Sequence, residues 1–276
     1  MRSTMLIPNT LRMEHMPKMV YVLIKLINSG EYTSEDLRKR ITASMCQEYE
    51  DDSRARFNRL LTFACAGELI TEENGFYKTE FKEDELISFD EFAYSLMGKM
   101  SSATDNMFNA LLRYYLSTSN FEESEFSSSA EKFRIKAIEN AEVKKYNVEE
   151  DSIHGFFFWI EAFQIANFEG NRTGHVYFAI ENLLIKYLEK HPEIKNAGSM
   201  PVREFLDRLQ QDIYFIPFCC ESDRNGITYP MAQALRILEN MDMIQLEYRQ
   251  DSDQMWHLPA SFVFSSGNTF TNVRVL

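Results

Sequence analysis

The sequence contains few of the residues that break helices or form cross-links. Its 276 residues include 10 glycines, 7 prolines and 4 cysteines. The low glycine and proline content, together with a hydrophobic fraction of 45%, indicates a globular and largely helical protein. A chain of this length is sufficient for two or three small domains, each with its own core.

The four cysteines lack the paired spacing of a zinc site or of a disulfide framework. Cys65 falls in an apolar stretch with helical spacing, so we expect it to pack there as a small hydrophobic residue. Cys219 and Cys220 are adjacent, which is compatible with redox chemistry, but buried thiols are the favoured interpretation. Cys46 stands alone in a polar segment. We therefore expect no metal ion and no other cofactor.

The sequence also lacks an apolar run long enough to cross a bilayer. The longest such stretch, residues 155–168, contains Glu161 and is shorter than the about 20 residues that a membrane-spanning helix needs. The first residues do not contain the uninterrupted apolar core of a signal peptide. These features predict a cytoplasmic protein with no membrane partner.

Basic residues are outnumbered by acidic ones. The chain has 29 Lys and Arg against 42 Asp and Glu, which gives a formal net charge of −13. This balance argues against a protein that coats nucleic acid non-specifically, because such binding depends on neutralising phosphates. It does not exclude one local cationic face, since the field depends on the distribution of charges as well as on their sum.

Sequence signatures of catalysis are missing. The five histidines are scattered without the i, i+4 spacing of metal ligands on a helix, and there is neither a phosphate-binding glycine loop nor a Gly-x-Ser-x-Gly elbow. His154 and Glu161 fall two helical turns apart, and we interpret them as a polar pair within the core. The sequence therefore predicts a protein that is not an enzyme.

Residues 1–85 show three helical segments followed by a hairpin pattern. Two short strands are predicted around Asn74-Gly75, a dipeptide favoured in two-residue hairpins. The predicted helices cover residues 18–30, then 35–41 with Thr33 or Ser34 as cap, then 53–66 with Ser53 as cap. Over residues 11–82 this order resembles the winged helix-turn-helix family. The resemblance implies a mainly helical fold with small β wings, whose third helix lies in the major groove of DNA.

The third predicted helix has one apolar and one polar face. Successive residues are about 100° apart around a helix, so Phe57, Leu60, Leu61 and Ala64 gather on an inward face. Arg59 falls near the middle of the opposite face. Arginine and asparagine are the side chains that pair in a bidentate manner with guanine and adenine. The predicted groove contacts are Arg54, Arg56, Asn58, Arg59 and Thr62, and the predicted phosphate contacts are Arg38, Lys39, Arg40 and Lys78.

A second interpretation is that these arginines only keep an exposed helix soluble. Glu68, Glu72 and Glu73 weaken the hairpin as a phosphate contact, and the acidic segment 48–52 adds repulsion just before the helix. Both interpretations remain open from the sequence.

The remaining chain is predicted as a helical linker over 86–170, a second winged-helix unit over 171–260 and a tail over 261–276. Residues 152–168 are apolar all round and predict a buried helix. In the second unit, helices are predicted over 175–191, 200–211 and 227–241, followed by two strands within 242–258. The aromatic tail is expected to add a strand, cover a groove or dock on a partner.

An offset of 174 residues relates the two predicted units. It places Leu61 on Leu235 and Ala64 on Leu238, and it aligns the apolar ends of "GELI" and "MDMI". The same offset replaces Arg54, Arg56 and Arg59 by Thr228, Pro230 and Gln233. The second unit thus keeps the core pattern without the charge, and we expect it to contact protein or a second copy of the chain.

Two further resemblances bear on function. Residues 6–27, "LIPNTLRMEHMPKMVYVLIKLI", resemble the start of DpdG-type proteins, winged-helix components of bacterial clusters that modify DNA with deazapurines and restrict foreign DNA. This implies a DNA-binding accessory subunit in antiviral defence; a transcriptional regulator fits the same pattern. The acidic surface instead resembles the kleisin-binding winged-helix subunits of SMC complexes, which implies a protein-interaction module. A hydrolase without a sequence signature is the third alternative.

Overall fold

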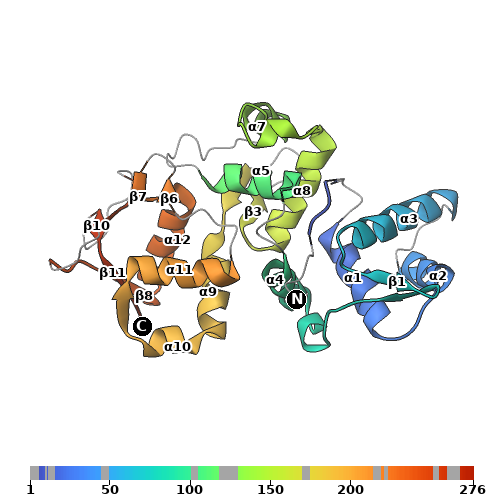
Figure 1. Ribbon diagram of the computed structural model, residues 1–276, viewed down its shortest axis with the longest axis horizontal. Helices are drawn as coiled ribbons and strands as arrows, with labels where there is room; N and C mark the ends of the chain where they lie inside the picture. Colours follow the sequence, from blue (N-terminus) through green and yellow to red (C-terminus); the bar gives the residue numbers. More distant parts are fainter. Residues whose placement is uncertain are drawn as a thin grey trace. The chain divides into compact units, whose positions relative to one another are not determined.

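The computed structural model describes residues 6–9, 11, 16–44, 50–100, 105–117, 130–169, 175–213, 219–220, 223–250, 255–259 and 268–276. Helices dominate, and the strands form small sheets whose pairs are mainly antiparallel (Figure 1). This confirms the predicted class, mainly helical with small β elements. The α-helices are α1 (Pro17–Asn28), α2 (Ser34–Ser44), α3 (Glu50–Ala66), α4 (Phe89–Lys99), α5 (Met107–Leu116), α7 (Ala130–Ala137), α8 (Glu150–Ala162), α9 (Ile180–Lys190), α10 (Pro192–Asn196), α11 (Val202–Asp212) and α12 (Tyr229–Asn240).

The chain divides into two compact units, and each is assembled from two separate stretches of sequence. Unit 1 contains Met1–Phe108 and Tyr146–Phe163, and unit 2 contains Asn109–Lys145 and Gln164–Leu276. The boundaries predicted from the sequence fall after residues 85, 170 and 260, so the segment predicted as a separate linker is shared between the two units.

In unit 1, α1, α2 and α3 gather around a short hairpin (Figure 1). Strands β1 (Thr71–Glu73) and β2 (Phe76–Lys78) pair across Asn74 and Gly75. Both turn residues have positive φ, 54° and 82°, as a type I′ turn requires. The Tyr77 amide also donates to the Tyr32 carbonyl at 3.4 Å, so β2 lies between β1 and the segment that joins α1 to α2. The predicted hairpin is confirmed.

The starts of α2 and α3 depend on short polar side chains near their first turns. Of the two predicted caps for α2, Thr33 is the one used: its Oγ1 accepts from the Asp36 amide at 3.3 Å, and the Asp36 carboxylate accepts in turn from the Thr33 hydroxyl at 2.6 Å. The predicted start of α3 at Ser53 is wrong, because α3 already begins at Glu50. Acidic residues at positions 50–52 favour this longer helix, since negative charge stabilises a helix N-terminus.

Unit 1 is completed by α4 and α8. The ring of Phe92 on α4 contacts Phe81 at 5.2 Å and Tyr21 of α1 at 5.5 Å between centroids. The helix predicted over 152–168 ends at Ala162, and Gln164 takes a left-handed φ of 57°. The residues that follow form strand β3 (Ala166–Glu169), so the prediction of one continuous helix is wrong there.

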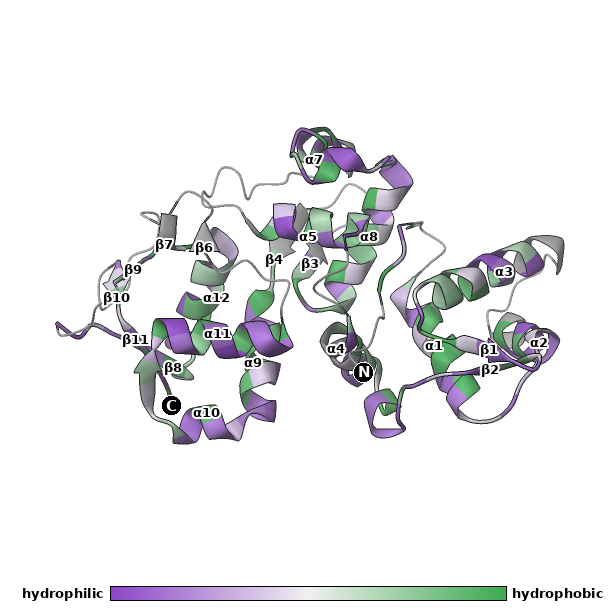
Figure 2. Cartoon of the chain, in the orientation of Figure 1, coloured by the Kyte–Doolittle hydropathy of each residue, from purple (hydrophilic) through white to green (hydrophobic). Residues whose placement is uncertain are grey.

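The second stretch of unit 2 begins with a strand pair that the sequence pattern did not reveal. Strand β4 (His175–Phe178) pairs with β3, and α9 starts only at Ile180. The prediction of helix from residue 175 is therefore wrong for the first five residues. Farther along the chain, α11 has alternating hydrophilic and hydrophobic residues (Figure 2), and it buries Val202, Phe205, Leu206 and Leu209.

The central sheet of unit 2 uses the C-terminal tail as its middle strand. Strand β11 (Asn272–Val275) pairs with β5 (Ser199–Pro201) on one side and with β8 (Ile244–Glu247) on the other. The sequence predicted that β8 would be followed by its own partner within 242–258. Instead, β9 (Trp256–His257) joins a separate sheet with β6 (Cys219–Cys220), β7 (Asp223–Ile227) and β10 (Thr269–Phe270). Of the three alternatives for the tail, the added strand is the one found for residues 272–275.

Both units show the same order of chain segments at their sheets. In unit 2 the last strand, β11, lies between the strand before α11 and the strand after α12. In unit 1, β2 lies in the same way between the Tyr32 segment and β1. The two three-helix arrangements therefore share this order of paired segments, although β1 and β2 are joined by a two-residue turn whereas β9 and β10 lie between β8 and β11 in the chain.

Candidate nucleic-acid interface

The inward face of α3 is buried as the sequence predicts. Phe57 is 3% exposed and Ala64 is fully buried, and Leu60 and Leu61 lie with them in the core. These residues lie on the side of α3 that packs against α1 and α2 in unit 1. The opposite face of α3 therefore points away from the core of unit 1.

The predicted groove residues lie on the exposed side of α3. The side chains of Arg54, Arg56, Asn58, Arg59 and Thr62 are all exposed. They fall within two and a half helical turns, and α3 contains no acidic residue from position 53 to its end at Ala66. The structure thus brings the five predicted contacts together on one helix.

One side of α3 is covered by a contact that the sequence interpretation missed. Phe63 is 1% exposed, and its ring stacks on Trp159 of α8 with centroids 6.0 Å apart and planes at 22°. Because Phe63 follows Arg59 by one turn, Arg59 lies at the border of the exposed face and not near its middle. The sequence feature that could have revealed this contact is the aromatic Phe63 three positions after Leu60, because it widens the apolar arc of the helix.

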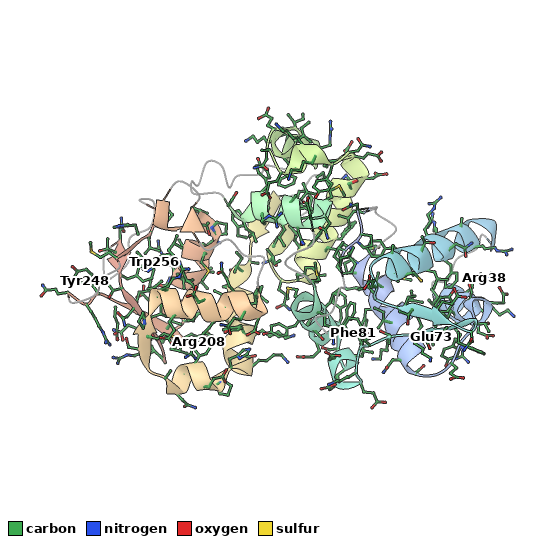
Figure 3. The ribbon with its side chains drawn as sticks, in the orientation of Figure 1. Arg38, Glu73, Phe81, Arg208, Tyr248 and Trp256 are labelled. Atoms are coloured by element: carbon green, nitrogen blue, oxygen red, sulfur yellow. The ribbon has the colours of Figure 1, made fainter. Side chains whose placement is uncertain are left out.

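The carboxylate of Glu35 on α2 interacts with two of the predicted phosphate contacts, Arg38 and Lys39. Arg38, labelled in Figure 3, donates to Glu35 from Nε at 3.0 Å and from Nη2 at 2.8 Å. Lys39 Nζ lies 3.7 Å from the same carboxylate. We call Glu35, Arg38, Lys39 and Arg54 the Glu35 cluster, because all three cations act on this one carboxylate. The cluster carries a net positive charge.

The electrostatics of Glu35 show how close these cations are. The pKa of Glu35 is lowered to about 2, mainly by the hydrogen bond from Arg38; burial opposes this shift, and the charges of Arg38, Lys39 and Arg54 add to it. The Glu35 side chain is half exposed. The charge of Arg54 on α3 contributes least of the three cations to this shift.

The remaining predicted phosphate contacts have other neighbours. The Arg40 guanidinium lies over the Tyr32 ring, 4.8 Å from its centroid. Lys78 forms an ion pair with Glu73 at 2.5 Å, and this hydrogen bond raises the pKa of Lys78. The Tyr77 hydroxyl donates to Glu72 at 3.3 Å. The hairpin is thus locally neutral or acidic, and Lys78 is the weakest of the predicted phosphate contacts.

The matched helix of unit 2 has a different environment. At the 174-residue offset, the positions of Arg54, Arg56 and Asn58 correspond to Thr228, Pro230 and Ala232, all of which are buried. Tyr229 lies at the start of α12, and its ring contacts Phe178 of β4 at 6.2 Å. Of the five positions of α12 that match the predicted groove contacts of α3, these three are therefore buried within unit 2, whereas Gln233 is half-buried and Arg236 is exposed.

Other chemistry finds little support in the described part of the chain. It contains no group of three or more His, Cys, Asp or Glu residues placed to hold a metal ion. The predicted polar pair of His154 with Glu161 is wrong: His154 Nε2 lies 3.8 Å from Glu150, and Glu161 is exposed. Among the helices that the structure describes, none has both the length and the apolar character to span a membrane.

Comparison of the chain with protein-family models, with curated proteins and with solved structures finds no match.

Proposed function

We propose that this chain is a tandem winged-helix protein whose unit 1 binds duplex DNA through α3. The shared order of paired segments in the two three-helix arrangements supports the tandem assignment. In a winged helix the third helix enters the major groove and the hairpin lies beside it. In unit 1 these elements are α3 and the β1–β2 hairpin.

The observation that carries the proposal is the contrast between α3 and α12. α3 presents three arginines, an asparagine and a threonine to solvent, whereas three of the five matched positions on α12 are buried and only Arg236 is both exposed and charged. A helix that only needed to be soluble would not require three guanidinium groups with no acidic residue among them, in a chain of net charge −13. The contrast favours a polyanionic ligand for unit 1 and a structural role for α12.

The chemistry of the exposed face fits a DNA groove. Arg54 and Arg59 supply bidentate donors for guanine edges, and Asn58 can pair with adenine. Lys39 and Arg40 on α2 are suited to the phosphates that flank the groove, where they fix position without reading sequence. Because the hairpin is acidic, we expect few phosphate contacts from it.

In the cell, such a protein acts by binding and not by catalysis. We propose that it serves as a DNA-engaging accessory subunit of a DNA-modification or defence system, or as a transcriptional regulator. Both roles require a helix that contacts DNA and a second surface for protein partners.

The test is a duplex-binding titration over a series of salt concentrations. Wild type is compared with a variant in which Arg54, Arg56 and Arg59 are replaced by glutamine. Each lost phosphate contact reduces the slope of log affinity against log salt by about 0.9, so we expect a slope about one to three units shallower. Each lost base contact costs about 1–3 kcal/mol of binding free energy.

A matched control separates these contacts from a general charge effect. Replacing Arg203, Arg208 and Arg236 of unit 2 by glutamine gives the same formal net charge of −16. This control should retain most of the wild-type affinity. Absence of duplex binding by wild type at about 50 mM salt, or equal losses in both variants, would contradict the proposal.

A second candidate function is that of a protein-interaction subunit without direct DNA contact. Unit 2 favours it, because Met241 and Leu276 are 53% and 45% exposed, and the Leu276 amide donates to the Met243 carbonyl beside them. Tyr248, labelled in Figure 3, adds an exposed aromatic side chain to these two exposed hydrophobic residues of unit 2. Purification from the native host checks this candidate: a stoichiometric protein partner supports it, and a monomer that binds duplex alone argues against it.

A further inference from the structure

The Glu35 cluster has the geometry of an occupied anion site. A guanidinium that offers two parallel N–H groups is shaped to bind the oxygens of a carboxylate or a phosphate. In unit 1 that fork, from Arg38, is filled by Glu35 at 2.8 and 3.0 Å. Lys39 approaches the same carboxylate from the next turn of α2, and the charge of Arg54 reaches it from α3.

We propose that Glu35 is a built-in competitor that occupies a phosphate-binding site formed by Arg38 and Lys39. The ligand class is a phosphate group; on DNA it is a backbone phosphate next to the groove that α3 enters. This inference deepens the proposed function and, for its DNA ligand, depends on it.

The exposure of the cluster makes such an exchange feasible. The side chains of Glu35 and Lys39 are 53% and 66% exposed, whereas that of Arg38 is 20% exposed, so the carboxylate and the lysine are the parts of the cluster that water reaches most. Exposed ion pairs contribute little to stability, because water screens the attraction and both side chains lose conformational freedom. Breaking the ion pair of Glu35 therefore costs little free energy, and a phosphate that replaces the carboxylate keeps most of its own binding free energy.

The pairing also has a consequence for selectivity. While Glu35 fills the fork of Arg38, a single small anion meets a cluster whose charge is partly neutralised. A DNA backbone brings many phosphates and releases condensed counterions when they are neutralised, so it competes better than an isolated anion. Glu35 thus weakens binding of free phosphate and restricts the site to polyanions.

The test uses the full chain with Glu35→Gln, and Glu80→Gln as the control. Glu80 is exposed in unit 1 after the hairpin and makes no part of the Glu35 cluster, so both variants change the formal charge equally. The probes are inorganic phosphate, followed by the thermal unfolding midpoint at fixed ionic strength, and a duplex, followed over a salt series. An anion that binds the folded state raises the midpoint as its concentration increases.

The expected result is a larger phosphate-induced rise in the midpoint for Glu35→Gln than for wild type or Glu80→Gln. Duplex affinity should rise roughly threefold with Glu35→Gln, the effect of removing one unit charge near a phosphate in water. The salt slope should become about one unit steeper.

The phosphate measurement decides the inference, and the duplex measurement decides the proposed function. Equal phosphate responses of the two variants overturn the inference, whatever the duplex data show. A larger response of Glu35→Gln in a protein that binds no duplex supports the anion site and refutes DNA as its ligand.

Discussion

Glu68 and Asp242 have the same left-handed backbone conformation, with φ of 54° in both, one residue after the C-caps of α3 and α12. Their positions differ by 174 residues. The following amide in each case reaches back five residues, from Leu69 to the Ala64 carbonyl at 2.9 Å and from Met243 to the Leu238 carbonyl at 3.0 Å. This is the Schellman arrangement, and it supports the structural equivalence of the two helices.

The shared cap predicts a gain in stability from glycine. A left-handed conformation costs a residue other than glycine about 1–2 kcal/mol of strain. Glycine avoids this strain but loses more chain entropy on folding, which offsets about 0.5–1 kcal/mol of the gain. Glu68→Gly and Asp242→Gly should therefore each raise the free energy of unfolding by about 0.5 kcal/mol. Chemical denaturation measures this. The matched Glu68→Ala and Asp242→Ala changes keep the strain, and stabilisation by them as large as that by glycine would argue against the conformation.

Removal of the C-terminal strand should unfold the central sheet of unit 2. Without residues 272–276, β5 and β8 lose their common partner, and Val273, which is 1% exposed between them, is lost from the core. Denaturation followed by the emission of Trp256, with Trp159→Phe to remove the other tryptophan, should show a much lower midpoint or no cooperative transition. Removal of Leu276 alone, an exposed residue, is the control and should change little.

The carboxylate of Glu247 predicts a pH-dependent contribution to stability. It accepts from Ser199 Oγ at 2.7 Å, Arg249 Nη2 at 3.1 Å and Arg274 Nε at 2.8 Å. Partial burial acts to raise the pKa of Glu247, but the hydrogen bonds from Ser199 and Arg249 and the nearby arginine charges outweigh it and lower the pKa. The folded state therefore binds the proton more weakly than the unfolded state does.

A lowered folded-state pKa means that the stabilisation is complete above the unfolded pKa, about 4.3, and is lost as the pH falls through the folded value. Glu247→Gln should cost about 1–2 kcal/mol at pH 7, and the difference from wild type should shrink below about pH 4. Glu204→Gln removes an exposed ion pair within α11 and should cost less than about 0.5 kcal/mol. If the difference in free energy of unfolding between wild type and Glu247→Gln stays constant down to pH 3, the lowered pKa of Glu247 is contradicted.

Substitutions of the neighbouring residues Phe63 and Thr62 should affect different properties, the first stability and the second duplex binding. Phe63 is buried against Trp159, so Phe63→Ala should lower the free energy of unfolding by about 3–5 kcal/mol. Thr62 is exposed, so Thr62→Ala should change stability by less than about 0.5 kcal/mol while weakening duplex binding. Emission of Trp159 in a Trp256→Phe background follows the first effect, and a duplex titration follows the second. The opposite pattern would place the binding surface elsewhere.

Local sequence patterns predicted the elements of unit 1 well. Apolar spacing located α1 and the buried face of α3, and Asn74-Gly75 located the hairpin turn, because these features depend on neighbours within a few residues. The start of α3 was wrong because acidic residues at 50–52 suit a first helical turn as well as a loop.

Elements whose partners are distant in sequence could not be predicted in this way. Residues 175–178 share their apolar character with a helix, and only pairing with β3 makes them a strand. The role of residues 272–275 depends on β5, about 70 residues earlier, so the local pattern left several alternatives open. Likewise, Phe63 is covered by Trp159, 96 residues away, and the helical wheel of α3 alone assigned too wide an exposed face.

The most direct test of the account asks which third helix meets DNA. A photo-crosslinking p-benzoylphenylalanine replaces either Thr62 on α3 or Arg236 on α12, two exposed positions related by the 174-residue offset. After irradiation with a labelled duplex, we predict a protein–DNA adduct for the substitution at Thr62 and none for that at Arg236. An adduct at Arg236 of equal yield, or no adduct at Thr62 in a protein that still retains the duplex, would contradict the assignment of α3 as the DNA-binding helix.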